Sequence, residues 1–155
     1  MAEEFTIRQG TVEDAETVVS QRCGMFRDMG FPEDAKMKQM ADRFRPWLVQ
    51  KMQAGEYLTW FALDDQGEVA AGLGMWLMDW PPHLIGTGPP RANILNVYTR
   101  PESRRHGLAK LLLDRAIEWC RANGVGTLSL HASAAGRRVY ESAGFKPTTE
   151  MRLVL

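Results

Sequence analysis

The spacing of hydrophobic and polar residues changes several times along the chain, and each change predicts an element. Residues 4–9, EFTIRQ, alternate between apolar and polar and predict a short strand. Residues 12–29 follow a helical spacing, with Thr11 as a cap and acidic residues in the first turn, where the helix dipole favours them. A second helix is expected over 34–54, and Pro46 is expected to kink or split it.

The centre of the chain has the spacing of two paired strands. Apolar runs at 56–63 and 68–78 flank the letters DDQG, and Gly67 can take a left-handed turn position there. A β-hairpin is therefore predicted. The next segment, 79–91, contains four of the eight prolines, so regular structure should end in it. It is either a rigid crossing loop or the lip of a binding site, because loops often carry function.

The second half of the chain alternates strands and helices. The expected elements are a strand at 92–99, a helix at 106–124, a strand at 127–133, a helix at 135–144 and a last strand at 150–155. The whole order is β-α-α-β-β-β-α-β-α-β. It predicts one α/β domain over residues 1–155, with a mixed, mostly antiparallel sheet of about six or seven strands flanked by helices.

The composition argues against several classes of function. Lys plus Arg and Asp plus Glu each number 19, so the net charge gives no reason to expect nucleic acid or a membrane surface as a partner. No apolar run approaches the roughly 18 residues that span a bilayer, and the acidic N-terminus lacks a signal-peptide core, which predicts a soluble, cytoplasmic protein. Two distant cysteines and three histidines without ligand spacing predict neither a disulfide nor a metal site.

The letters RPESRRHGLAK, residues 100–110, lead directly into the predicted helix of the second half. A helix start has backbone N–H groups without internal partners and a partial positive charge, which suits phosphate oxygens. Gly107 allows close approach of the backbone, Ala109 is small, and Arg104, Arg105 and Lys110 add charge. A basic turn that merely caps the helix is the structural alternative. Neither the P-loop pattern nor the dinucleotide fingerprint is present.

A longer pattern surrounds this turn. The segment NVYTRPESRRHGLAKLLLDRAIEWCRANGVGTLSLHASAAGRRVYESAGF resembles the GNAT superfamily of acyl-CoA-dependent N-acetyltransferases. The pyrophosphate loop of that family has the form [QR]-x-x-G-x-[GA], which residues 104–109 match, and Tyr140 followed by AGF at 143–145 matches two later landmarks. The resemblance covers residues 92–146. It implies transfer of the acetyl group of acetyl-CoA to a primary amine, a small molecule or a peptide, by direct attack in a ternary complex.

The resemblance also implies which residues hold the coenzyme. The strand before the turn carries a bulge in this family, and its backbone pairs with the pantetheine arm, while the turn wraps the pyrophosphate. The residues expected to bind acetyl-CoA are Val97, Tyr98, Thr99, Arg104, Arg105, His106, Gly107, Leu108, Ala109, Lys110 and Ser133. Val97 and Thr99 could instead serve strand packing alone. Ser133 replaces the usual asparagine, so it either contacts the coenzyme or caps a helix.

Tyr140 stands at the tyrosine position of the family and is the expected acid for the leaving thiolate, the alternative being a core tyrosine. A backbone N–H freed near Val97 or Tyr98 is expected to stabilise the oxyanion. Neither adjoining strand contains a carboxylate, so His131 is the expected base, since histidine titrates near neutral pH. A structural histidine is the alternative to that role, and Asp79 is a weaker candidate base.

The acceptor is expected between the helices at 13–54 and the loop at 79–91, where Trp47, Trp76 and Trp80 could line it. The sequence leaves the acceptor open among polyamines, amino acids, drug amines and protein N-termini, and it is compatible with a homodimer. Two other functions stay open as well. One is a non-catalytic acyl-CoA-binding or regulatory module on the same fold, and the other is a phosphate-dependent nucleotide binder.

Overall fold

The computed structural model describes residues 4–86, 88 and 90–155. In chain order, its helices and strands are β1 (Thr6–Gln9), the 3-10 turn η1 (Val12–Asp14), α1 (Ala15–Asp28), α2 (Ala35–Gln53), β2 (Tyr57–Leu63), β3 (Val69–Met78), β4 (Arg91–Thr99), η2 (Pro101–Ser103), α3 (Leu108–Ala122), β5 (Leu128–Leu130) and α4 (Arg137–Ser142). The predicted α/β fold with a mixed sheet flanked by helices is confirmed.

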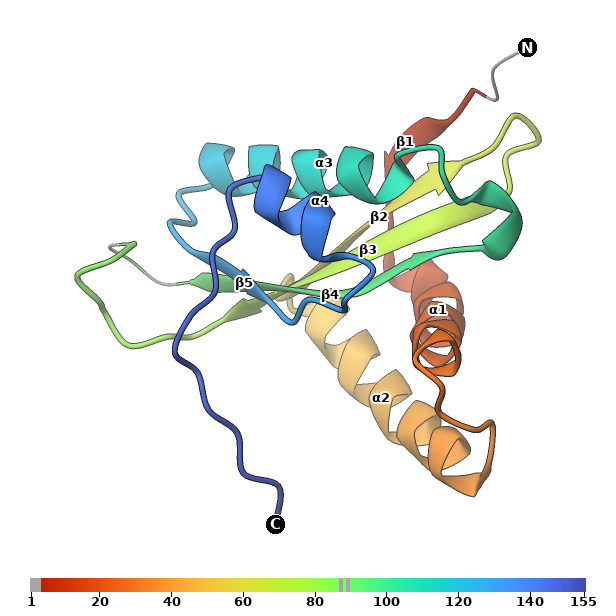
Figure 1. Cartoon of the computed structure of the whole chain (residues 1–155), viewed down its shortest axis with the longest axis horizontal. Coiled ribbons are helices and arrows are strands. Elements are labelled where there is room, and N and C mark those ends of the chain that lie inside the picture. The colour runs from red at the N-terminus through yellow and green to blue at the C-terminus, as the bar shows by residue number, and fades with distance from the viewer. Residues whose placement is uncertain (1–3, 87, 89) are drawn as a thin grey trace.

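The described strands form one sheet in the order β1-β2-β3-β4-β5. The first four strands are antiparallel neighbours, and only β4 and β5 are parallel. Helices α1 and α2 lie on one face of the sheet, and α3 and α4 lie on the other (Figure 1). The sheet has five strands in the part of the chain that the structure describes, fewer than the six or seven expected.

Alternation along β2 explains why both faces carry a hydrophobic core. Tyr57 and Phe61 point to the cluster that α1 and α2 cover, whereas Trp60 and Ala62 point to the cluster that α3 covers. The central strand β3 is apolar on both faces, as expected for a strand covered by helices on both sides. The two clusters contact opposite faces of β4, so this strand is held between the two helical layers.

Pro46 does not split the second helix, because α2 continues through it from Ala35 to Gln53. Proline removes the N–H that would bond to the carbonyl of Asp42. Pro46 and Asp42 are both exposed, so water can take the place of that lost bond. Apart from this, the two long helices have the predicted bounds to within a few residues. No helix in the described ranges has the length and apolarity to cross a bilayer.

The predicted last strand at 150–155 is wrong for this structure, in which these residues form no strand. The segment after α4 runs away from the body of the molecule (Figure 1). Met151, Leu153 and Val154 keep between 81 and 94% of their surface exposed. The apolar alternation that predicted a strand is present, but a strand also needs a neighbouring strand for its backbone hydrogen bonds.

Candidate active site

Strand β4 contains a bulge at the position where the resemblance requires one. Leu95 pairs with Gly74 and Tyr98 pairs with Gly72, so two residues of β4, Asn96 and Val97, lie opposite a single residue of β3. Asn96 has a left-handed backbone with φ of 58°. Asparagine tolerates this conformation better than most residues, and an extra residue leaves local backbone groups outside the ladder. The bulge therefore supplies the unpaired strand backbone that the expected oxyanion site needs.

The pairing of β4 with β5 stops just before this bulge. The two strands pair only through Ala92 to Ile94 and Leu128 to Leu130. The edge of β4 beyond Ile94 thus has no strand neighbour on that side among the described residues. The segment Val97–Thr99, expected to bind the pantetheine arm, lies on this open edge. Three residues of β4 are therefore available to an extended ligand that pairs as a strand.

The turn after β4 presents backbone N–H groups at the start of α3. Arg105 and Gly107 have left-handed backbones, with φ of 67° and 71°, and α3 begins at Leu108. In the described structure, the N–H groups of Gly107, Leu108, Ala109 and Lys110 donate to no protein acceptor. A Cβ on Gly107 would meet no atom within 4 Å, so the space beside it is open. Free amides at a helix start form an anion site.

The charged side chains of the turn mostly face other partners. Arg104 donates to Asp28 at 2.5 Å and to the Thr99 carbonyl at 3.0 Å. Lys110 pairs with Asp114, one helical turn further on, at 2.6 Å. Arg105 is exposed and has no ion pair with any described residue. The backbone amides are therefore the main groups that this turn offers to an anion.

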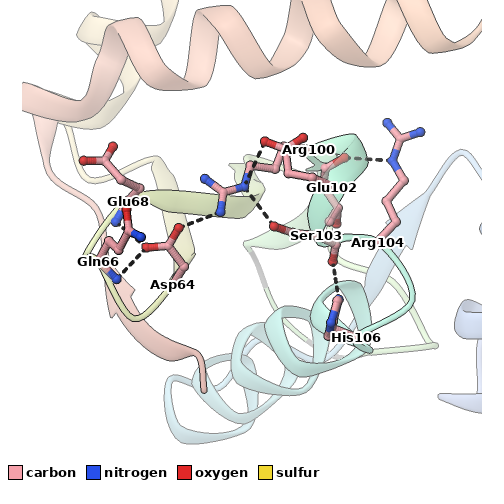
Figure 2. A network of polar contacts seen from close by, with 9 residues as sticks. Asp64, Gln66, Glu68, Arg100, Glu102, Ser103, Arg104 and His106 are labelled. Atoms are coloured by element: carbon pink, nitrogen blue, oxygen red, sulfur yellow. Dashed lines mark hydrogen bonds and ion pairs between the residues drawn. The ribbon is translucent and has the colours of Figure 1, made fainter. Parts of the chain in front are cut away.

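A polar network ties the turn to the hairpin between β2 and β3 (Figure 2). Arg100 donates to Asp64 at 2.6 Å and to the buried hydroxyl of Ser103 at 2.8 Å. Asp64 also accepts from two N–H groups of its own hairpin, and these contacts, Arg100 first, hold the pKa of its carboxyl below the usual range. The ring of His106 lies with Nδ1 3.0 Å from the Ser103 carbonyl. The network fixes the path of the turn.

Tyr140, the expected acid, lies on the short helix α4. Its ring is partly buried and packs edge-on against Phe145 at 6.1 Å between centroids. Burial raises the pKa of the Tyr140 hydroxyl. The Ser133 hydroxyl accepts from the N–H of Gly136 at 3.1 Å, within the turn before α4, whose N-cap residue is Gly136. A contact between Ser133 and the coenzyme stays a prediction.

The two candidate bases lie at different places relative to the bulge. His131 directly follows β5 and is one residue beyond the last pair with β4, beside the open strand edge. Arg152 places Nη2 3.3 Å from Nε2 of that ring. Asp79 follows β3, next to the pair of Met78 with Arg91, and this pair marks the other end of β4. The geometry therefore favours His131 over Asp79.

The three tryptophans expected at the acceptor site do not all meet. Trp47 of α2 and Trp76 of β3 pack edge-on at 5.3 Å, in one group with Phe44 and Tyr57. Trp80 lies elsewhere, under the guanidinium of Arg91 at 4.3 Å. Gly86 of the following loop packs against residues 126–127, because a Cβ on Gly86 would lie 1.9 Å from Oγ1 of Thr127.

A partly buried polar chain, which the sequence did not predict, joins α1 to the bulge. Arg22 donates to Oδ1 of Asn96 at 2.7 Å, and Nδ2 of Asn96 donates to the hydroxyl of Tyr57 at 2.9 Å. Gly74 makes room for that hydroxyl, since a Cβ there would lie 1.8 Å from it. The sequence does contain a signal, because Arg22 follows buried Val18 by four residues and so interrupts the apolar stripe of its helix.

A hollow of the surface lies beside this site, between α1 and strands β3 and β4. Gln21, Ala70, Tyr98 and Arg100 line it, together with the first turns of α1. Gln21 reaches so far over β3 that a Cβ on Gly72 would lie 2.1 Å from its Oε1. The residues that line the hollow do not include the amide-rich turn.

A mixed sheet with a bulged strand that leads into an amide-rich helix start is the architecture of acyl-CoA-dependent acetyltransferases. The sequence profile of the acetyltransferase (GNAT) family matches residues 23–145 of this chain. The protein therefore belongs to the GNAT acetyltransferase family, whose members carry out acetyl transfer that depends on acyl-CoA. The resemblance found in the sequence is confirmed.

Solved structures give the same result. A GCN5-related N-acetyltransferase from Ralstonia eutropha JMP134 is 32% identical, with a TM-score of 0.91 and alignment over 98% of this chain and 99% of that one. A predicted acetyltransferase with acetyl-CoA from Clostridium acetobutylicum is 25% identical, with a TM-score of 0.87 and coverage of 98% and 96%. Glucosamine-6-phosphate N-acetyltransferase from Arabidopsis thaliana, at 16% identity and a TM-score of 0.69, shares the fold over 99% of both chains. A search of curated protein sequences gave no match.

Proposed function

We propose that this protein transfers the acetyl group of acetyl-CoA to a primary amine, by direct attack of the amine in a ternary complex. The observation that carries the proposal is the continuity of the open edge of β4 with the free amides at the start of α3. These two features suit the two ends of one ligand. An extended arm with amide groups can pair with the strand edge, and a diphosphate can bind at the helix start.

The residues present fit coenzyme A. Val97, Tyr98 and Thr99 offer their backbone to the pantetheine arm, and the amides of the turn from Gly107 onward offer theirs to the diphosphate. Arg104 and His106 hold the turn through Thr99 and Ser103. Arg105 remains exposed at the same turn and adds charge near the diphosphate. Acetyl-CoA is thus a substrate gripped mainly by main-chain groups.

Acetyl transfer to an amine poses three chemical problems. An amine with a lysine-like pKa is neutral in only about one molecule in a thousand at pH 7, so a base must take its proton. The carbonyl becomes an oxyanion during attack, and an N–H group in the bulge at Asn96 and Val97 can donate to it. The thiolate that leaves needs a proton, and the Tyr140 hydroxyl can supply one because burial keeps it in its protonated form.

We assign the base to His131, which acts directly or through a water molecule. It is the titratable side chain next to the point where β4 and β5 stop pairing. The segments that flank this point, 92–99 and 127–133, contain no carboxylate that could act in its place. A His131→Ala variant should lose the acidic limb of the pH–rate profile, and a variant that keeps this limb excludes His131.

Calorimetry with coenzyme A tests the role of the turn. A valine at Gly107 disfavours the left-handed backbone by about 1–2 kcal/mol, which should move the free amides and raise the Kd about 10-fold or more. Gly124→Val is the matched control, because Gly124 has the same φ of 71° and equally open surroundings but lies at the other end of α3. It should lose stability without losing affinity. Equal affinity in both variants contradicts the proposed site.

A thiol-release assay with acetyl-CoA and a panel of amines tests the reaction itself. Amine-dependent release of free thiol is expected. Binding of coenzyme A without release for any amine would instead identify a non-catalytic acyl-CoA-binding module. Binding of ATP in preference to coenzyme A would overturn both and favour a nucleotide-binding role.

A further inference from the structure

Arg22 is a partly buried guanidinium on α1, the helix that packs against both α2 and the sheet. Its Nη1 donates to Asn96, and its charged carbon lies 5.0 Å from the ring centre of Phe26 and 4.7 Å from that of Phe44. Its Nε is enclosed and has no hydrogen-bond partner within the described structure. Burial lowers the pKa of Arg22, but a guanidinium stays charged in proteins.

This partly buried charge has no counter-charge in the described part of the chain. No described carboxylate lies within 4 Å of Arg22, whereas Arg100, the other partly buried arginine of the site, has Asp64 at 2.6 Å. Asn96 is neutral. Tyr57 is neutral as well, because burial raises the pKa of its hydroxyl. Charges in protein interiors are normally paired, since an unpaired one is costly to bury. The two aromatic rings compensate for only part of that cost.

The place of this charge is also the place of the reaction. Asn96, which accepts from Arg22, is the first residue of the bulge whose N–H groups face the oxyanion under the proposed function. The aromatic group of Phe44, Trp47, Tyr57 and Trp76 forms an apolar wall around the same residues. An acceptor amine that attacks at the bulge therefore brings the rest of its molecule close to Arg22.

We propose that Arg22 binds a carboxylate of the acceptor, so that the substrate is an amine that also carries a carboxylate group. The inference rests on the proposed function, because it takes the bulge as the point of attack. The guanidinium has N–H donors on Nη1 and Nη2 beyond the one that Asn96 accepts, and a carboxylate that takes them supplies the missing counter-charge. Arg22 thereby selects amino acid-like acceptors over neutral and cationic amines, and Asn96 positions its guanidinium.

Matched pairs of acceptors test this proposal. Glycine, β-alanine and 4-aminobutyrate are compared with their carboxamides, so that each pair differs only in the anionic group, and the series varies the distance from amine to carboxylate. The wild-type protein should favour the carboxylate of at least one pair by about 10- to 100-fold in kcat/KM, the range expected for a hydrogen bond between charged groups. Arg22→Gln should abolish the preference by raising KM for the carboxylate and leave KM for acetyl-CoA unchanged.

Two further variants make the test specific. Arg22→Lys retains the charge and should retain part of the preference. Arg43→Gln removes a charge from an exposed position of α2 and should leave the preference intact. Coenzyme A calorimetry on each variant shows that it is folded, and Arg22→Lys carries the test if the glutamine variant is not. Equal turnover of both members of every pair by the wild-type protein overturns the proposal, as does an unchanged preference in Arg22→Gln.

A binding measurement separates this proposal from the proposed function. Absence of acetylation for every amine would refute the reaction. In that case the same carboxylates should still raise the Tm of the wild-type protein but not that of Arg22→Gln, and this result would support the anion site. Failure to raise either Tm overturns the anion site. Aminoethylphosphonate is tested as an acceptor alongside the carboxylates. If it is turned over faster than every carboxylate, the anion that Arg22 binds is tetrahedral, which contradicts the proposed carboxylate.

Discussion

Residues 4–125 and residues 126–155 differ sharply in how they are packed. Every buried residue of the described chain lies in the first region, and the last of them is Val125. The second region contains β5, α4 and the extended end of the chain. It contacts the core through partly buried side chains, among them Val139, Tyr140 and Phe145. The two regions therefore contribute very differently to the free energy of unfolding.

The proposed functional groups are divided between the two regions. The bulge, the amide-rich turn and Arg22 belong to the packed region, where helices on both faces of the sheet fix their positions. The proposed acid Tyr140 and the proposed base His131 belong to the lightly packed region. A packed region suits groups that must hold a ligand in one geometry. The contrast predicts that substitutions in the second region change turnover much more than stability.

The largest effect should come from Tyr140→Phe, which removes one hydroxyl from the lightly packed region. Turnover should fall by about 10²- to 10⁴-fold, the range for general acid catalysis, with little change in the affinity for coenzyme A. Burial raises the pKa of this hydroxyl above its ordinary value of 10.0, so the acid form persists through neutral pH and is lost only above pH 10. Steady-state kinetics at saturating substrates measures the turnover, and calorimetry measures the affinity for coenzyme A.

The alkaline side of the pH profile provides the control. In the wild-type protein, any loss of turnover caused by Tyr140 should have its midpoint above pH 10, and that loss should be absent from Tyr140→Phe. Unchanged turnover in the variant at neutral pH shows that Tyr140 is only a core residue. A loss of stability without a change in turnover leads to the same conclusion, because the ring packs against Phe145.

The sequence predicted the packed region better than the lightly packed one. Hydrophobic spacing located α1, α2, the hairpin and α3, because each of these elements buries a face against the same core. The predicted strand at 150–155 failed, because its pattern cannot show whether a neighbouring strand is available. Arg22 and Asn96 were missed for a related reason. Their meaning depends on a contact between residues 74 positions apart, which local patterns do not contain.

The packed region should respond to a core substitution with a loss of stability. Leu112 of α3 is fully buried in the cluster between that helix and the sheet. Leu112→Ala should lower the free energy of unfolding by about 2–5 kcal/mol, because it leaves a cavity in a well-packed core. Urea denaturation measures the change. A loss below about 1 kcal/mol would show that the core around α3 collapses into the space.

The smallest effect should come from the same substitution in the lightly packed region. Leu153 is 81% exposed, so Leu153→Ala should change the free energy of unfolding by less than about 0.5 kcal/mol. It has the same chemistry as Leu112→Ala, and the difference between the two variants isolates the packing of their regions. Urea denaturation at two protein concentrations is the measurement. A loss above about 1 kcal/mol that grows with protein concentration would contradict the contrast, because it would mean that a second chain covers this segment.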